Sequence, residues 1–253
     1  MKIFLAAVEQ HLSALKEYNC IGSLRDMLIL ESFYYLKKSK NDLNWIVNSE
    51  NFLLDSGAFT FMQQSNLACD FDRYTEEYAA FINKYDIKYF FELDIDSVVG
   101  LQKTEILREK LERLTSKKPI PVWHLSRGKE YFEWMCKNYS YVAFGGILTD
   151  GLSSKTLEKY FPWFIRTAHK YGARIHALGY TSVNLKNYAF DSADSTSWKH
   201  GNLNGSRALF LPNEKCIKSI NKPKNTRALN YKKLLAYNFS QWLKFQKFAE
   251  TNM

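Results

Sequence analysis

The sequence predicts an α/β fold in which a (β/α)8 barrel is followed by a basic helical extension. The chain has 253 residues, close to the roughly 250 that such a barrel uses. Short apolar runs alternate with helical patterns along most of it, and most of the net positive charge lies in the residues that follow them. Hydrophobic residues make up 46% and charged residues 24%, which is typical of a folded domain and argues against disorder.

Eight short runs are expected to form the strands. They consist mainly of aliphatic and aromatic residues and end in polar residues or glycine, a pattern typical of strands buried on both faces of a parallel sheet. In chain order they are KIFLAA (2–7), MLIL (27–30), NFLLD (51–55), KYFFELD (88–94), IPVWHL (120–125), YVAFGG (141–146), RIHALG (174–179) and YAFDSAD (188–194).

Three longer segments between these runs are expected to form helices. Residues 71–86 carry apolar side chains at helical spacing, and Asp70 can cap their first turn. Residues 101–116 repeat leucines at the same spacing, and residues 154–172 contain Pro162, which is expected to kink their helix. Because the last two strand runs leave little room for a helix and the second run is short, a doubly wound open sheet is the alternative.

The positive charge is concentrated at the end of the chain. Residues 213–253 contain nine Lys or Arg against Glu214 and Glu250, so they carry +7 (nine minus two) of the +9 total. We expect residues 1–212 to form the barrel domain and 213–253 a basic, aromatic-rich helical tail packed on or beside it. Such an element is typical of polyanion binding, although a solvated basic helix face is the alternative. Candidates for contacting a nucleic-acid backbone are Lys215, Lys218, Lys222, Lys224, Arg227, Lys232 and Lys233.

Several classes of protein are disfavoured. The opening MKIFLAA is too short for a signal peptide, and no apolar stretch approaches the length of a membrane span. The four cysteines lie far apart without a CxxC spacing, which disfavours a disulfide framework and a zinc knuckle and indicates a cytoplasmic protein. Since no histidine metal motif or phosphate-binding glycine motif occurs, we expect neither a metal nor a cofactor.

Polar residues follow several of the predicted strands. In a barrel these strand ends meet at one mouth, which would bring together Asp55, Asp94, His124 and an acid of the last run. A single aspartate in such a place is often a helix cap, but several would repel one another and raise each other's pKa values. Paired carboxylates without a metal are typical of glycosyl transfer.

Five motifs resemble the tRNA-guanine transglycosylases over about residues 1–200. They are LLDSGAF (53–59), ELDID (92–96), FGGI (144–147), HALGY (176–180) and FDSADSTSW (190–198). Members of this family are TIM barrels that exchange guanine in a nucleic acid for a 7-deazaguanine base. The DSTSW form is most similar to the phage and bacterial branch that places 7-deazaguanines in DNA.

The resemblance implies a role for each matching residue. Asp55 matches the general acid/base and Asp94 the carboxylate that reads the N1/N2 edge of guanine. His124 is near a base-contacting position of the family, but a buried, hydrogen-bonded histidine is an equally good interpretation. The full set of base-binding candidates is Asp94, Ser56, Gly57, Phe59, His124, Gly145, Gly146, Ile147, Leu178 and Gly179.

Two aspartates match the family's nucleophile. Asp191 and Asp194 are three residues apart, so on a regular strand they point to opposite faces and only one can enter the mouth. Asp194 is nearer the carboxyl end of its strand, where barrel chemistry takes place. We therefore predict Asp194 as the nucleophile and keep Asp191 as the alternative.

The chain departs from the family members that act on tRNA. Those carry a Cys-x-Cys-x-x-Cys plus His zinc site after the nucleophile, whereas only Cys216 follows it here. We therefore expect a zinc-free enzyme whose basic tail contacts the nucleic acid. The expected polymer is DNA rather than tRNA. The exchanged bases are expected to be free guanine and a 7-deazaguanine such as preQ0. Helper subunits could open the DNA. The alternatives are a tRNA-acting enzyme, a nucleic-acid glycosylase, a nucleoside deoxyribosyltransferase and a non-catalytic binding subunit.

Overall fold

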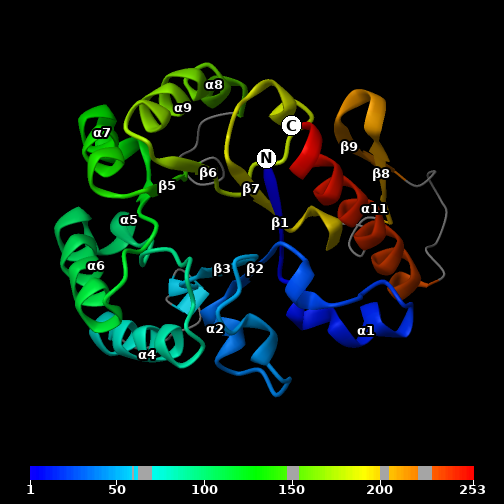
Figure 1. The fold of residues 1–253 in the computed structure, drawn as a ribbon, viewed down its shortest axis with the longest axis horizontal. Coiled ribbons are helices and arrows are strands. Elements are labelled where there is room, and N and C mark those ends of the chain that lie inside the picture. Colours follow the sequence, from blue (N-terminus) through cyan, green and yellow to red (C-terminus); the bar gives the residue numbers. More distant parts are fainter. Residues whose placement is uncertain (59, 62–69, 147–153, 200–204, 222–229) are drawn as a thin grey trace.

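A computed structural model describes residues 1–58, 60–61, 70–146, 154–199, 205–221 and 230–253. At its centre is a curled parallel sheet of seven strands in the order β3-β2-β1-β7-β6-β5-β4, with helices around its outer side (Figure 1). The strands are β1 (Lys2–Ala6), β2 (Ile29–Ser32), β3 (Phe52–Asp55), β4 (Val122–Trp123), β5 (Tyr141–Phe144), β6 (Arg174–Ala177) and β7 (Ser192–Ser195). The predicted α/β class with a parallel sheet is confirmed.

The fourth predicted run has no regular strand but lies between β3 and β4. Isolated parallel bridges join Phe90 to Leu54 of β3 and Phe91 to Ile120, just before β4. Backbone hydrogen bonds support both bridges, at 2.9 Å from the N–H of Phe91 to the carbonyl of Leu54 and 2.7 Å from Ile120 to Phe90. This stretch of backbone is therefore bridged once to β3 and once to the segment just before β4.

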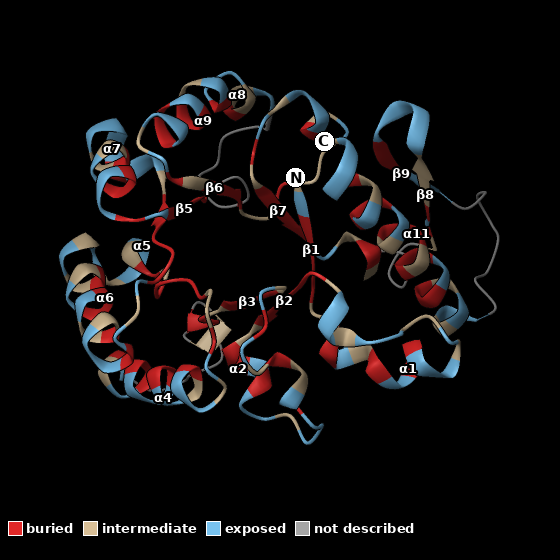
Figure 2. Cartoon of the chain, in the orientation of Figure 1, coloured by how far each residue is buried: buried red, intermediate tan, exposed pale blue. Residues whose placement is uncertain are grey.

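Alternate strand residues separate two apolar layers. Residues such as Ile3 and Val142 point outward and pack against the helices in the main core. Their neighbours, among them Phe4, Leu53 and Ala143, form a second cluster on the inner side of the curl. This alternation follows from the two-residue period of a strand, and Figure 2 shows the buried strands inside a layer of half-exposed helices.

The helices of the outer layer are mostly short. They are α1 (Leu12–Glu17), α2 (Phe33–Leu36), α4 (Phe71–Lys84), α5 (Asp96–Val99), α6 (Leu101–Thr115), α7 (Gly128–Asn138), α8 (Ser154–Glu158), α9 (Phe161–Lys170) and α11 (Tyr231–Asn252). Helix α4 begins where the sequence predicts, because the side chain of Asp70 accepts a hydrogen bond from the N–H of Arg73 at 3.0 Å. Its buried Tyr78 donates to the carbonyls of Leu54 and Phe91, which fixes α4 against the sheet.

The segment around Pro162 differs from the prediction of one kinked helix. Helix α8 ends at Glu158, and α9 begins at Phe161 with Pro162 in its first turn. Proline lacks the N–H that an interior helical position must donate, but the first turn does not need it. The proline therefore starts a second helix.

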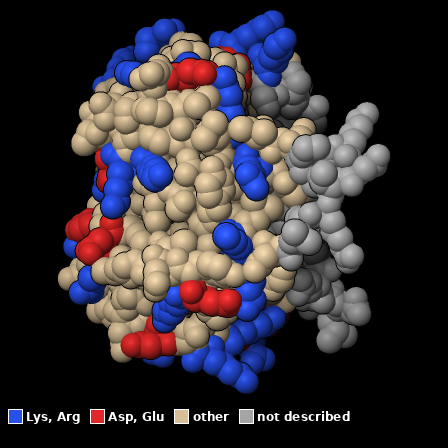
Figure 3. Space-filling model, turned by 90° about the vertical axis from the view of Figure 1, so that its right-hand side faces the viewer, with Lys and Arg blue, Asp and Glu red and all other residues tan. Residues whose placement is uncertain are grey.

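The chain after β7 forms a hairpin and a long helix. Strands β8 (Arg207–Leu211) and β9 (Cys216–Ile220) pair antiparallel, so the hairpin spans the expected boundary between residues 212 and 213. Helix α11 packs against β8 and β1 and buries one side, including Phe239 and Trp242. The side of the molecule that carries α11 and the hairpin shows Lys and Arg around a broad uncharged area, with fewer acidic groups (Figure 3).

Polar contacts tie α11 to the start of the sheet. The side-chain amide of Gln246, which is 2% exposed, donates to the carbonyls of Ile3 and Leu28 at 2.8 Å each. At the end of the helix, the amino group of Met1 donates to the carbonyl of Met253 at 2.7 Å. Helix α11 thus belongs to the layer that covers β1. Among the described residues, none of the helices has both the length and the apolar character needed to cross a bilayer.

Replacing Gln246 by leucine tests this attachment. Gln246→Leu keeps the volume but leaves two buried carbonyls without this donor, so the free energy of unfolding should fall by about 1–3 kcal/mol. Urea unfolding followed by circular dichroism measures the loss. The neighbouring Lys247→Leu on the exposed side of α11 is the control and should change stability by less than about 0.5 kcal/mol; equal losses would contradict the role of Gln246.

Candidate active site

Asp55 ends β3 on the inner side of the curl. It is aligned with Ser32 of β2, and its Oδ2 accepts the N–H of Gly57 at 3.0 Å. Gly57 has a φ of +64°, and a Cβ there would lie 2.2 Å from the Ser32 hydroxyl oxygen and 2.6 Å from Cβ of Tyr34. Only glycine fits this turn, so the DSG motif holds the Asp55 carboxyl by a backbone bond.

The Asp55 carboxyl lies near two other predicted acids. Its pKa is raised to about 6, first by burial and then by the charges of Asp94 and Asp194, while the hydrogen bond from Gly57 opposes the rise. The three aspartates come from strand ends far apart in the chain, and their electrostatic coupling shows that the fold brings them together. A carboxyl with a pKa near 6 carries a proton for part of the time at neutral pH.

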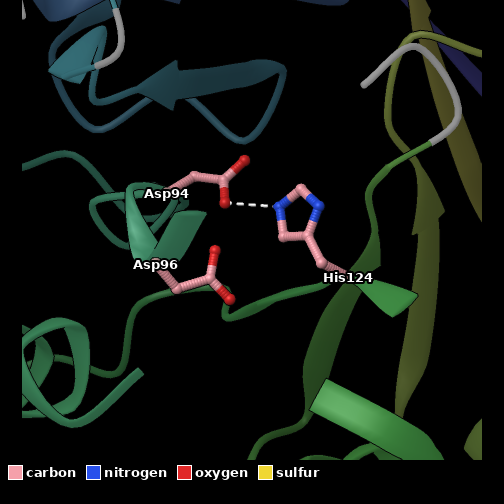
Figure 4. Close-up of side chains that lie close together, drawn as sticks. All are labelled: Asp94, Asp96 and His124. Atoms are coloured by element: carbon pink, nitrogen blue, oxygen red, sulfur yellow. Dashed lines mark hydrogen bonds and ion pairs between the residues drawn. The ribbon is translucent and has the colours of Figure 1, made fainter. Parts of the chain in front are cut away.

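Asp94 is paired with His124. The His124 Nε2 lies 2.5 Å from Asp94 Oδ1, with the two side chains facing each other from the segment after residue 91 and from the end of β4 (Figure 4). Both side chains are partly exposed, that of Asp94 by 25% and that of His124 by 13%. The two residues therefore form one polar unit at the mouth.

Asp96 lies beside this pair but binds elsewhere. Its Oδ2 accepts from Nε of Arg127 at 2.8 Å, and the same guanidinium donates to the fully buried Glu92 at 2.8 Å. Arg108 holds the other oxygen of Glu92 at 3.1 Å. This buried network supports the loop that carries Asp94.

Ligand atoms of Asp94, Asp96 and His124 lie within 4.8 Å of one another, close enough for a cation to be considered. Both carboxylates are already engaged, however, one with His124 and the other with Arg127. The guanidinium of Arg127 also places a positive charge at the set, which opposes a cation there. We therefore propose no metal at this cluster.

Asp194 lies on the inner face of β7, directly opposite Phe4 of β1. Its Oδ1 accepts the N–H of Gly179 at 2.7 Å and lies 3.1 Å from Nε2 of His176. The side chain of Asp194 is 10% exposed and that of His176 is fully buried. Both of these hydrogen bonds end on the same carboxylate oxygen.

A hydrogen-bond chain continues from His176 into the sheet. The His176 Nδ1 lies 2.7 Å from the Ser192 hydroxyl, which in turn lies 2.5 Å from the hydroxyl of Tyr141. An ionised Asp194 can only accept, so His176 Nε2 carries the ring proton and Nδ1 accepts from Ser192. The chain thereby fixes the tautomer and the orientation of the imidazole.

Asp191 lies on the other side of the sheet. Its Oδ2 accepts the N–H of Ile175 at 2.7 Å and is 3.0 Å from Nε2 of His169 on α9. The two aspartates therefore occupy opposite faces, with Asp194 at the mouth and Asp191 against the helix layer.

The glycine motifs lie close to these groups. A Cβ on Gly145, which follows β5, would be 2.6 Å from Cγ1 of Val122 and 3.1 Å from Cε1 of His124. Gly146 and Gly179 have φ of +76° and +69°, and the N–H of Gly179 binds Asp194. Leu178 packs against the inner apolar cluster.

Ser56 accepts two hydrogen bonds, one at its hydroxyl and one at its carbonyl. Its hydroxyl accepts the N–H of Ala58 at 3.3 Å, and its carbonyl accepts the hydroxyl of Tyr74 at 2.7 Å. The remaining base-binding candidates, Phe59 and Ile147, lie outside the described residues.

The predicted backbone-binding cations are spread over the hairpin and the start of α11. Lys215 donates to the carbonyl of Asn252 at 3.1 Å, Lys218 pairs with Glu214 and Lys232 with Glu17. Lys233 is exposed on α11. The other three candidates, Lys222, Lys224 and Arg227, lie outside the described residues.

Sequence reasoning assigned no role to His176, Arg127 or Ser32. His176 lies two residues before Leu178 on the same strand, so the strand period alone places both on the inner face. The Ser32 hydroxyl is buried at the end of β2 without a hydrogen-bond partner among the described residues. In the sequence, Ser32 lies two residues after Leu30, so the strand period could have placed both side chains on the same face. Arg127 gives no such signal, because only the tertiary fold brings it to Glu92.

Comparison of the chain with protein-family models, with curated proteins and with solved structures found no match in any of the three. The chemistry of the site therefore rests on its residues and geometry.

The raised pKa of Asp55 predicts a pH dependence of stability. The folded protein holds this proton up to about pH 6, whereas an unfolded aspartate loses it near pH 4. The stabilising contribution of the protonated carboxyl is thus present below about pH 4 and lost as the pH rises to 6. The free energy of unfolding of the natural protein, relative to Asp55→Asn, should fall across this window in urea titrations.

The control for this titration is Asp86→Asn. The exposed Asp86 has its pKa lowered by a bond to Lys117, so its contribution is lost as the pH falls, the opposite direction. If the difference in the free energy of unfolding between the natural protein and Asp55→Asn stays constant from pH 4 to 7, the Asp55 carboxyl is ionised like an exposed one.

Proposed function

We propose that the protein is a base-exchange glycosyltransferase that replaces guanine in DNA by a 7-deazaguanine such as preQ0. The observation that supports this most is the environment of Asp194, which is held by His176 and Gly179 through one oxygen. A carboxylate fixed in this way can direct its other oxygen at a sugar carbon. Two further carboxyls, Asp55 and Asp94, interact electrostatically at the same mouth and would act on the base.

The proposed scaffold is a closed (β/α)8 barrel. The bridged backbone at Phe90 and Phe91 would be its fourth strand, completing the ring between β3 and β4. The pairing of β7 with β1 already joins the last strand of the ring to the first. In such a barrel the carboxyl ends of the strands form the reaction mouth, which is where Asp55, His124 and Asp194 lie.

The proposed reaction proceeds in two displacements. The free oxygen of Asp194 bonds to C1′ of the target nucleotide while the C1′–N9 bond breaks, and the bonding pair leaves with guanine. Asp55 donates a proton to the leaving base. It then takes the proton from N9 of the incoming 7-deazaguanine, which attacks C1′ and releases the carboxylate. Configuration at C1′ is retained because each displacement inverts it.

The base would be recognised on the side of the mouth opposite Asp194. Asp94 would accept the N1–H and N2–H donors of guanine, and its contact with His124 orients the carboxylate. Gly145 and Gly146 carry no side chain, which would let a flat ring approach the backbone after β5. A nucleotide in a duplex would have to be flipped out of its stack, at a cost of a few kcal/mol.

The proposal includes residence in the cytoplasm and turnover without a metal or redox cofactor. Cys20, Cys136 and Cys216 are free thiols, which is compatible with a reducing compartment. DNA is proposed as the polymer because of the DSTSW form of the last motif, and partner subunits would supply any opening of the duplex.

Trapping the covalent intermediate tests the function. Protein mixed with a guanine-containing DNA strand and a slow base analogue should give an adduct that survives denaturation. Asp194→Asn should abolish it, whereas Asp191→Asn, its control three residues away, should keep it. An adduct with tRNA alone would reassign the polymer, and loss of guanine without incorporation of labelled base would identify a glycosylase.

His176 is expected to act as a positioning residue for Asp194. His176→Ala removes a buried donor to the nucleophile and should lower kcat by about 10² with little change in KM. His176→Gln retains an N–H donor and should recover part of the rate, which separates positioning from a packing defect. A rise in KM alone, or a Gln variant as slow as the Ala variant at equal stability, would refute this role.

A further inference from the structure

A cavity of about 240 Å³ lies beside the strand that carries Asp194. The loop after β6, the residue Ser197 after β7, the β8–β9 hairpin and helix α11 form its walls. Among its described lining residues there is no carboxylate. Its side chains with hydrogen-bonding groups are those of Thr181, Ser182, Ser197, Ser206, Lys218, Ser219, Asn238 and Trp242.

The cavity is connected to the candidate active site through β7. The Thr181 hydroxyl donates to the hydroxyl oxygen of Ser195 at 2.9 Å, and the N–H of Ser197 donates to the same oxygen at 3.1 Å. Ser195 directly follows Asp194 in β7 and is paired with Leu5 of the outer core, so its hydroxyl lies on the face opposite the Asp194 carboxylate. The cavity is nevertheless at the same end of the sheet as the mouth, because Thr181, Ser182 and Ser197 follow the carboxyl ends of β6 and β7.

The lining is suited to an anion rich in oxygen. Four hydroxyl groups and one ammonium group can donate hydrogen bonds, because the Thr181 hydroxyl already donates to Ser195 and Asn238 is bound to the backbone of Ala208 and Ser206. The volume is below the roughly 300–1,000 Å³ of pockets for drug-sized ligands. It therefore suits a phosphodiester group better than a nucleotide with its base.

Lys218 is the cation at this cavity. Its Nζ pairs with Glu214 at 2.5 Å, with both side chains nearly half exposed. Such a surface pair contributes little, about 0–1 kcal/mol, so a phosphate can replace Glu214 at low cost. Of the described backbone-binding candidates, Lys215 and Lys232 do not line the cavity and bind Asn252 and Glu17 instead.

We propose that this cavity binds a backbone phosphate of the nucleic-acid strand next to the nucleotide that reaches Asp194. The proposal rests on the proposed function for the choice of polymer, and on the cavity and its donors for the site. It assigns the contact with the strand to Lys218 and the serine hydroxyls.

The test measures binding of a fluorescent single-stranded oligodeoxynucleotide that carries one guanine, by anisotropy between about 50 and 200 mM salt. Ser219→Trp places a large ring at the exposed edge of the cavity and should weaken binding at least about tenfold, the size of one lost charge-assisted contact. Its control, Ile220→Trp, changes the next residue of β9, which is 51% exposed and outside the lining, and should bind normally.

Lys218→Ala should lower the slope of log K against log salt by roughly 0.7, the value for one phosphate contact on a single strand. The matched Lys247→Ala, which removes an exposed lysine of α11 outside the cavity lining, should leave the slope unchanged. Inorganic phosphate at millimolar concentration should compete only weakly. Equally strong competition by free phosphate would make the cavity a site for the free anion and overturn the assignment to a strand.

The outcomes separate this site from the catalytic proposal. If Ser219→Trp and Lys218→Ala bind like their controls while guanine exchange continues with unchanged KM, the phosphate site is wrong and the transglycosylase stands. If both variants lose binding selectively but the natural protein exchanges no labelled guanine, the strand site stands and the proposed reaction is wrong.

Discussion

The pairing of β7 with β1 is the contact on which the rest of the structure depends. It joins the last strand of the parallel sheet to the first, and it sets Asp194 opposite Phe4 on the inner face. Because side chains alternate along a strand, a shift of one residue would turn Asp194 toward the helices and away from the inner face. The register of the two strands thus decides whether the Asp194 carboxylate faces the inside of the curl.

Contacts from outside the sheet hold this register. The indole N–H of Trp198 donates to the carbonyl of Ala6 at 2.9 Å, and Trp198 packs edge-on against Phe239 of α11. Gln246 of the same helix binds the carbonyl of Ile3. The C-terminal helix therefore fixes β1 at Ile3 directly and at Ala6 through Trp198. The position of Asp194 thus depends on a segment whose composition alone predicts only a basic tail.

Three carboxyls within one mouth have to be accommodated in different ways. Asp194 receives donors from His176 and Gly179, and Asp94 faces His124. The hydrogen bonds that Asp55 accepts come from the backbone, at Gly57 and Ser56, and its pKa rises to about 6. In the proposed reaction, these different environments would give one site both an ionised nucleophile and a proton donor.

The parts of this arrangement that the sequence predicts are those with a local signal. The apolar runs locate the strands, Asp70 marks the start of α4, and the spacing of Asp191 and Asp194 places them on opposite faces. What it misses depends on tertiary contacts. The segment at Phe90 and Phe91 reads as a strand but forms only single bridges on each side, and Arg127 reaches Glu92 through the packing of α7 and its preceding turn. The division of the chain at residue 212 overlooked the hairpin, because antiparallel pairing between 207–211 and 216–220 leaves no mark in net charge.

Part of the positive charge of the C-terminal segment is engaged within the fold. Lys218 and Lys232 are each paired with a glutamate, and Lys215 caps the last turn of α11 by binding Asn252. Exposed pairs of this kind cancel much of the field at a distance while costing little to exchange. At the proposed phosphate site the segment would hold a strand through a few exchanged contacts and neutral hydroxyl donors, without surrounding the acidic mouth by fixed positive charge. In the proposed reaction, such charge would lower the pKa of Asp55 and remove the proton that the leaving base requires.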